Sequence, residues 1–97
     1  MIKETTQKVI RKEVVEKDGY LYRYELLERR GKRMADFGMR LYSLRVAMTD
    51  SKGDTKQGEA QDLFSSKRKA LEFYERIVKN LATPIDLKYV IEDEIRS

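Results

Sequence analysis

The chain contains no cysteine, no histidine and no tryptophan, and it has a single proline. Without cysteine there can be neither a disulfide framework nor a thiolate nucleophile. Without histidine as well, the zinc sites that these two residue types build are excluded. We therefore expect no catalytic residues and no cofactor or metal site, and we interpret the protein as a non-enzyme.

Long apolar runs are also missing. No stretch approaches the roughly 20 apolar residues that a membrane-spanning helix needs. The first 13 residues, MIKETTQKVIRKE, lack the uninterrupted apolar segment of a secretory signal peptide. Together with the absence of cysteine, this pattern favours a reducing compartment, so we expect a cytoplasmic protein of bacterial type with no membrane partner.

Charge, by contrast, is abundant: 39% of the residues are charged, and the net charge is +4. Residues 1–33 hold ten Lys or Arg and six Asp or Glu, so this third of the chain carries the whole surplus. The densest cluster is RRGKR, at a predicted hairpin tip. Its members, Arg29, Arg30, Lys32 and Arg33, are candidate anion or nucleic-acid contacts. The simpler interpretation is a turn that charge keeps solvated.

The few glycines stand where turns are needed. Asp18-Gly19 predicts a two-residue type I′ hairpin turn, because both positions require a positive φ. Strict pairing about that turn would place Arg11 beside Leu26, so we expect a bulge or an early end in the first strand. A polar segment over about 55–63 suits an edge strand.

Gly31-Lys32 predicts a second two-residue turn, of type II′. In that register Leu26 pairs with Phe37, Tyr24 with Met39 and Tyr22 with Leu41. Because side chains alternate along a strand, these apolar residues would share one face. The opposite face would then carry four apolar side chains away from the helices, and they form a candidate partner surface: Leu21, Leu27, Tyr42 and Leu44.

The apolar period changes from two to about 3.6 after Ser65-Ser66, which are good helix N-cap residues. A second helix is predicted to begin at Pro84, with Thr83 as its N-cap and Asp86 completing a capping box. The first helix starts with Lys67-Arg68-Lys69, and the second ends near Glu92-Asp93-Glu94. If the two helices run antiparallel, these opposite charges can face each other.

These elements predict one domain over residues 1–97, of the α+β class: an antiparallel three- or four-stranded meander followed by two helices packed on one face. The predicted strands span residues about 8–17, 20–30, 33–49 and 55–63, and the predicted helices span residues about 66–82 and 84–95.

The C-terminal run LATPIDLKYVIEDEI, residues 81–95, resembles a family of small bacterial proteins of unknown function found in Firmicutes. The family pattern is Thr-Pro, a hydrophobic residue, then Leu, Val-Ile and Glu-Asp at fixed spacing. The matching residues here are Thr83, Pro84, Ile85, Leu87, Val90, Ile91, Glu92 and Asp93. The resemblance implies a single domain in a bacterial cytoplasm, and it implies no activity or ligand.

Three tyrosines, at positions 20, 22 and 24, fall on one face of the second predicted strand. They could form a base-stacking platform, but the two helices need an apolar face to pack on, so we interpret them as core. Ser66 and Lys69 fit the Ser-x-x-Lys pattern, and the serine is better explained as a helix cap.

The preferred hypothesis is an interaction or regulatory domain with an unknown protein partner or a second copy of itself; the alternative is a small nucleic-acid-binding protein.

Overall fold

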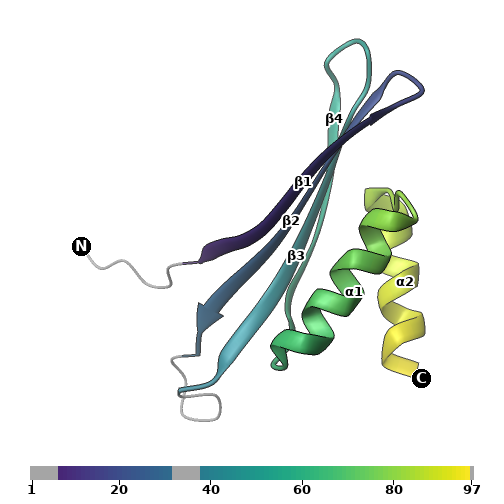
Figure 1. The fold of residues 1–97 in the computed structure, drawn as a ribbon. Helices are drawn as coiled ribbons and strands as arrows, with labels where there is room; N and C mark the ends of the chain where they lie inside the picture. Colours follow the sequence, from purple (N-terminus) through teal and green to yellow (C-terminus); the bar gives the residue numbers. More distant parts are fainter. Residues whose placement is uncertain (1–6, 32–37, 97) are drawn as a thin grey trace.

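A computed structural model of the protein describes residues 7–31 and 38–96. It contains four strands followed by two helices (Figure 1). In chain order the elements are β1 (Lys8–Lys17), β2 (Tyr20–Arg30), β3 (Arg40–Thr49), β4 (Thr55–Phe64), α1 (Lys67–Lys79) and α2 (Pro84–Arg96). The strands form one antiparallel sheet in the order β1-β2-β3-β4. The predicted α+β class, a meander followed by two helices, is confirmed.

β1 and β2 form the hairpin predicted at Asp18-Gly19. These two residues have φ angles of 54° and 82°, as the two central positions of a type I′ turn require. Arg11 pairs with Leu26, and the register shifts between Val9 and Arg11. The bulge expected in the first strand is therefore present, immediately beyond the pair that suggested it.

The register between β2 and β3 differs from the prediction. A two-residue turn at Gly31-Lys32 would pair Leu26 with Phe37, whereas Leu26 pairs with Leu44. β3 begins at Arg40, so the connection is longer than two residues, and positions 32–37 lie outside the described residues. The shift of seven positions is odd, and an odd shift exchanges the two faces of a strand.

The helices begin where the capping residues predicted. The Lys69 amide donates to the Ser66 hydroxyl oxygen over 3.3 Å at the start of α1. At the start of α2, the Asp86 amide donates to Thr83 Oγ1 over 3.1 Å, and the Thr83 amide donates to an Asp86 carboxylate oxygen over 3.2 Å. This reciprocal pair is a capping box. It begins α2 as a separate helix, since Pro84 cannot continue α1.

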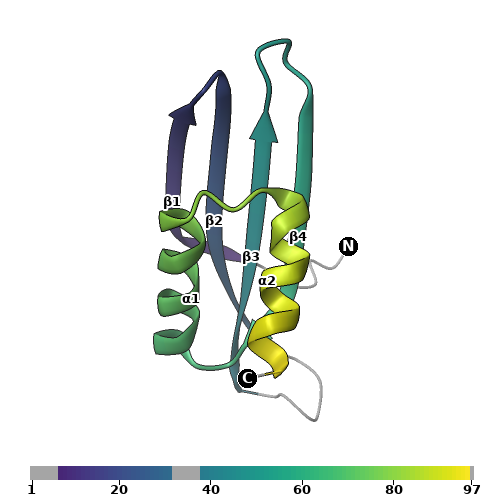
Figure 2. The same cartoon turned by 90° about the vertical axis from the view of Figure 1, so that its right-hand side faces the viewer.

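The molecule has two layers, a twisted sheet and a pair of helices on one of its faces (Figures 1 and 2). Figure 2 shows α1 over the β1–β2 side of the sheet and α2 over the β3–β4 side, running in opposite directions. We call the covered side of the sheet the helix face and the other side the open face. Neither helix in the described part of the chain is long and apolar enough to cross a bilayer.

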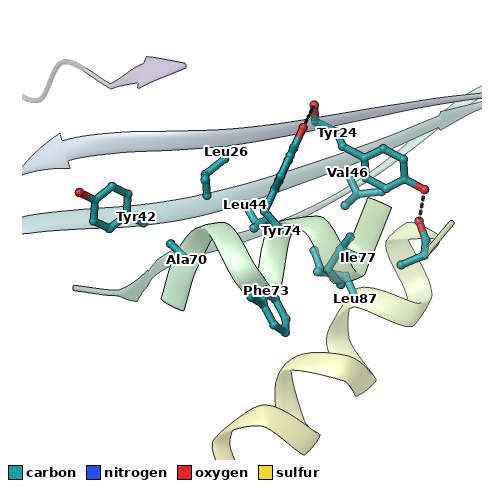
Figure 3. Close-up of a cluster of buried hydrophobic side chains, with 11 residues drawn as sticks. Tyr24, Leu26, Tyr42, Leu44, Val46, Ala70, Phe73, Tyr74, Ile77 and Leu87 are labelled. Carbon is teal, nitrogen blue, oxygen red and sulfur yellow. Dashed lines mark hydrogen bonds between the residues drawn. The ribbon is translucent and has the colours of Figure 1, made fainter. Parts of the chain in front are cut away.

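The core lies between the helix face and the two helices (Figure 3). Its buried residues come from β2, β3, both helices and the segment that joins the helices: Tyr24, Leu26, Tyr42, Leu44, Val46, Ala70, Phe73, Tyr74, Ile77, Ala82 and Leu87. Their burial supplies the hydrophobic stabilisation that neither helix has alone. Tyr24 donates its hydroxyl proton to the Ala82 carbonyl oxygen over 2.9 Å, which fixes the α1–α2 connection against β2.

The start of α2 rests directly on β4 at Gly58. A Cβ atom added to this glycine would lie 2.9 Å from the Pro84 carbonyl oxygen and 3.2 Å from the Pro84 Cα. Real Cβ atoms do not approach backbone atoms so closely. Glycine is therefore required here by the close approach of a helix backbone to a strand.

An ion pair joins the two helices. Arg76 of α1 donates to Glu94 of α2 over 2.6 Å. An acid at the end of α2 thus meets a cation of α1, but this cation lies two turns beyond the Lys67–Lys69 cluster that we expected to face the acids. Arg68, a member of that cluster, pairs with Glu72 in its own helix over 3.3 Å.

Candidate functional site

Arg29, the first residue of the basic cluster, is not the solvated side chain that the sequence predicted. The Arg29 guanidinium donates from Nε to Asp62 Oδ1 over 2.9 Å and from Nη2 to Oδ2 over 2.6 Å. The Arg29 side chain is 15% exposed and that of Asp62 is 29% exposed. Arg30 is exposed, while Lys32 and Arg33 lie outside the described residues. The prediction that Arg29 is a solvated contact is therefore wrong, because β4 supplies its counter-ion.

The predicted partner surface on the sheet is divided between the two faces. Leu21 and Leu27 lie on the open face, because they alternate with the core residues of β2. Leu27 is only 3% exposed, however, so it offers almost no surface to a partner. Tyr42 and Leu44 lie in the core beneath the helices, with 3% and 1% of their surface exposed. Their placement on the open face was wrong. The cause is the β2–β3 register, since an odd shift moves each side chain of a strand to the opposite face.

The open face carries a row of alternating charges. Lys12 pairs in register with Glu25, Glu25 with Arg45, and Arg45 with Glu59. The Arg45 guanidinium lies 3.0 Å from the Glu25 carboxylate and 3.9 Å from the Glu59 carboxylate. Beside this row is a shallow hollow of about 310 Å³ that includes Arg23 in its lining. The middle of the open face is therefore polar and electrically balanced.

A groove of about 500 Å³ lies beside the two helices. Leu63, Phe64 and Phe73 give it an apolar lining, and four charged side chains complete it: Lys69, Glu72, Arg76 and Glu94. The Arg76 guanidinium lies 5.2 Å from the centre of the Phe73 ring, within cation–π distance. Because the same guanidinium pairs with Glu94, it links the two helices and partly fills the groove that it lines.

A tyrosine ladder runs along the helix face of β2, out of the core. The rings of Tyr22 and Tyr24 stack with centroids 6.3 Å apart and an interplanar angle of 1°. Tyr20 and Tyr22 follow at 6.4 Å in a tilted arrangement. Tyr24 is fully buried, Tyr22 is half-buried and Tyr20 is 39% exposed. The predicted assignment of all three tyrosines to the core is thus correct for Tyr24 and wrong for Tyr20.

The ladder emerges because the sheet is longer than the helices. Figure 1 shows the β1–β2 and β3–β4 turns extending well past the α1–α2 connection. That connection crosses β2 at Tyr24, where the Ala82 carbonyl accepts the tyrosine hydroxyl. Val15 and Met48 pair with Tyr22 from the neighbouring strands, so they share its face. We call these four residues the tyrosine end: Val15, Tyr20, Tyr22 and Met48.

Acids and bases surround the tyrosine end in equal measure. A hollow of about 330 Å³ beside Tyr20 is lined by Asp18, Asp50, Asp54 and Lys52, with Gly19 and Ser51. Lys17 pairs with Tyr20 and Lys56 pairs with Met48, so two more cations flank the same residues. The rim therefore presents no large field of one sign to a partner.

A second cluster of polar groups lies at the β1 edge. The buried Tyr74 hydroxyl donates to the Glu13 carboxylate, and Arg11 lies 5.4 Å above the Tyr74 ring. Arg11 also pairs with Glu13 and Glu75, over 3.4 Å and 3.5 Å. These contacts explain how an arginine is tolerated opposite Leu26 on the helix face: its stem covers the core while its charge reaches two acids.

Burial raises the pKa of three tyrosines, Tyr24, Tyr42 and Tyr74. Burial raises the pKa of Tyr24 to about 12. Burial also raises the pKa of Tyr74 above its ordinary range, and the hydrogen bond to Glu13 raises it further. Tyr24 and Tyr74 are both buried, and Tyr74 also lines a small hollow of about 160 Å³ together with Arg11 and Glu13. In the ranges 7–31 and 38–96, no three acidic side chains are grouped so that they could hold a metal ion.

Comparison with known proteins places residues 3–97 within the model of a family described as a family of unknown function, DUF6514. The expected membership of a family without an assigned function is thereby confirmed. No curated protein matches the chain, and no solved structure matches it either.

Proposed function

The chain belongs to that family of unknown function, and from this premise we propose that it is a non-catalytic protein-binding domain whose contact surface is the tyrosine end. The observation that carries the proposal is the ladder of tyrosines, which leaves the core along β2 and becomes steadily more exposed from Tyr24 to Tyr20. Tyrosine and methionine are enriched in protein interfaces, because they offer a large contact area together with polar or polarisable atoms.

The Tyr22 ring is held in place by its neighbour before a partner binds. Tyr24 is held by the Ala82 carbonyl, and Tyr22 stacks flat on Tyr24. A partner that packs on Tyr22 would therefore order few side chains that are not already ordered. Such pre-organisation strengthens binding by lowering its entropic cost.

The balanced rim favours a protein partner over a nucleic acid. Phosphate backbones are bound by surplus positive charge, whereas Asp18, Asp50 and Asp54 lie beside the exposed Tyr20 ring. The alternative site for a nucleic acid, the basic cluster at 29–33, is weakened because Asp62 neutralises Arg29. Nucleic-acid binding is therefore the second hypothesis, to be decided by the experiment below.

The absence of enzymatic activity is part of the same proposal. The chain has no histidine or cysteine to act as a base or nucleophile at neutral pH. Of its two most perturbed tyrosines, Tyr24 is buried in the core and the Tyr74 hydroxyl is already engaged in a hydrogen bond to Glu13. The lack of cysteine further supports a reducing cytoplasm, in a bacterium, as the place where the domain works.

Site-specific photo-cross-linking tests the proposed surface. A benzophenone side chain would replace Tyr20 in one variant and Tyr89 in the matched control. Tyr89 is a tyrosine 61% exposed on α2, away from the ladder. Irradiated in cells of the source organism, position 20 is expected to give a discrete protein adduct that position 89 does not give. Excess unlabelled wild-type protein should suppress the adduct, and excess Tyr20→Lys protein should not.

Three outcomes would contradict the proposal. Adducts with nucleic acid at position 20 would favour the second hypothesis. Equal adducts at positions 20 and 89 would show that the tyrosine end has no special role. A lack of any adduct at position 20, with efficient cross-linking at position 89, would move the contact surface to α2.

A further inference from the structure

The open face has a property that the proposed function does not use: its central charges are arranged so that the face complements itself. The row across the four strands reads Lys12, Glu25, Arg45 and Glu59, with alternating signs and no net charge. The chain as a whole carries +4, so two copies repel each other on average. The row itself has no net charge, so it does not add to the repulsion between two copies.

When the row is read from β4 to β1 instead of from β1 to β4, each position carries a charge of the opposite sign. A twofold axis that lies in the plane of contact, parallel to the strands and between β2 and β3, reverses the order of the strands in the second copy. Lys12 then lies opposite Glu59 of the second copy, and Glu25 lies opposite its Arg45. Each of the four contacts joins opposite charges. A twofold axis across the strands would instead oppose like charges, which is unfavourable.

We propose that the open face binds the open face of a second copy of this chain, with the twofold axis parallel to the strands. Twofold homodimers with self-complementary interfaces are the commonest oligomers. Two sheets packed face to face keep their strands within about 30° of each other, which this axis allows. The sheet charges thus specify one arrangement of the two copies.

The size of the face is sufficient for a weak dimer. Strands about 4.8 Å apart with a rise of about 3.3 Å per residue give a four-stranded face of roughly 600 Å². Two copies would bury roughly 1,200 Å², at the lower end of the range for specific interfaces. The central side chains are half-buried already: Glu25 is 15% exposed and Arg45 is 35% exposed. They lose little further hydration when a second copy covers them. Val14, 53% exposed on the same face, adds apolar area.

The chain offers a test in which folding and association separate. Within one copy Lys12 and Glu59 lie on opposite edge strands, three strand spacings or about 14 Å apart, which is beyond the screening length of about 8 Å at physiological salt. Coupling between them therefore arises between copies and not within one. In a dimer of the Lys12→Glu variant, the new glutamate at position 12 of each copy would face Glu59 of the other copy, so two pairs of acids would repel. In a dimer of the Glu59→Lys variant, the new lysine at position 59 of each copy would face Lys12 of the other copy, so two pairs of bases would repel.

Analytical ultracentrifugation over a wide concentration range measures the outcome. We expect the wild type to be a reversible monomer–dimer mixture, and each single variant to associate at least tenfold more weakly. The decisive sample is an equimolar mixture of the two single variants, in which a Lys12→Glu copy meets a Glu59→Lys copy with opposite charges at both ends of the row. The mixture should recover wild-type association, and urea unfolding should show all the proteins equally folded.

The proposal is overturned if the wild type is monomeric at all concentrations, or if the mixture associates no better than its components. It goes beyond the proposed function and does not depend on it, because the tyrosine end lies on the opposite face. Tyr20→Lys is expected to leave the dimer unchanged. A failed self-association experiment would consequently leave the cross-linking experiment untouched, and the reverse is also true.

Discussion

At the scale of single residues, Arg29 shows how a side chain's role depends on a partner far away in the sequence. It belongs to the most basic segment of the chain, and its neighbours suggest a solvated turn. Its counter-ion, Asp62, stands 33 positions away in the irregular part of β4, with a φ of 53°. The bulge directs the Asp62 carboxylate across β3 toward β2. The charges that neighbour Arg29 in the sequence therefore do not predict its ion pair.

We expect Arg29→Ala to lower the free energy of unfolding by about 1.5–3 kcal/mol, the usual range for a hydrogen-bonded charged partner that is partly buried. Both donors to the Asp62 carboxylate are lost in this variant. The matched control is Arg30→Ala, one position along and exposed, which should change stability by no more than about 0.5 kcal/mol. Urea unfolding followed by circular dichroism measures both. Equal effects of the two substitutions would show that the Asp62 contact does not stabilise the fold.

The raised pKa of Tyr24 leads us to expect a loss of folding stability at alkaline pH. Its pKa is about 12 in the folded protein because the ring is buried, and an unfolded tyrosine titrates near pH 10. The folded state holds the proton more tightly, so this contribution is complete below about pH 10 and is lost as the pH rises toward 12. We expect the urea midpoint to fall through this interval, and to fall less steeply in Tyr24→Phe. A midpoint that is independent of pH up to 12 would contradict the burial of the hydroxyl.

At the scale of elements, the termini of helices and the tight hairpin could be predicted because their signals are local. The Thr83–Asp86 capping box and the Asp18-Gly19 turn each depend on residues within four positions. The β2–β3 pairing does not. A Gly-Lys pair suggested a two-residue turn, although β3 itself alternates apolar residues at even positions with Ser43 and Arg45. Giving that alternation more weight than the turn would have predicted the face of Tyr42 and Leu44.

The candidate site was predictable to a similar extent. Alternation along β2 is enough to place Tyr20, Tyr22 and Tyr24 on one face, and Leu21 and Leu27 on the other. It does not reveal where the covering helices stop. That limit is set by the bond between Tyr24 and Ala82, which are 58 positions apart. The extent of exposure along the ladder is therefore a tertiary property.

The contact between α2 and β4 leads to a prediction about Gly58. Replacing it by alanine should lower the free energy of unfolding by about 1–3 kcal/mol, because the new methyl group collides with the Pro84 backbone. Gln57→Ala is the matched control, since Gln57 is the exposed neighbour on the open face. Denaturant unfolding of both variants provides the measurement. Removing a glycine from an unobstructed strand normally stabilises it, so a gain at position 58 would mean that α2 does not rest there.

At the scale of the whole molecule, the defining feature is a sheet that is longer than its covering layer (Figure 1). Under the helices, strand residues such as Leu26 and Leu44 are almost completely buried. Beyond the α1–α2 connection, both sides of the sheet are accessible, with Tyr20 exposed on the helix face and Gln57 exposed on the open face. The two ends of one sheet are thus stabilised very differently.

Amide hydrogen exchange should reveal this gradient. We expect slow exchange, governed by global unfolding, around Leu26 and Leu44, and faster exchange through local opening toward the β1–β2 and β3–β4 turns. The physical cause is the loss of packing against the helices beyond Tyr24. Two-dimensional NMR after transfer to deuterated solvent would measure it residue by residue. Uniform protection along each strand would indicate that something else covers the tyrosine end.

The order of the strands also determines how the chain can be assembled in time. Each of the strands β2, β3 and β4 pairs with the strand that precedes it in the sequence, so every strand pairing joins segments that are neighbours along the chain. Such local topology favours rapid folding, and the first hairpin can close while the ribosome is still synthesising the rest of the chain. The Tyr24 hydroxyl then stays hydrated until Ala82 has been synthesised, because the Ala82 carbonyl is its hydrogen-bond acceptor. This bond of the core therefore forms late in synthesis. A nascent chain stalled before the helices would have a complete sheet whose helix face is exposed to solvent.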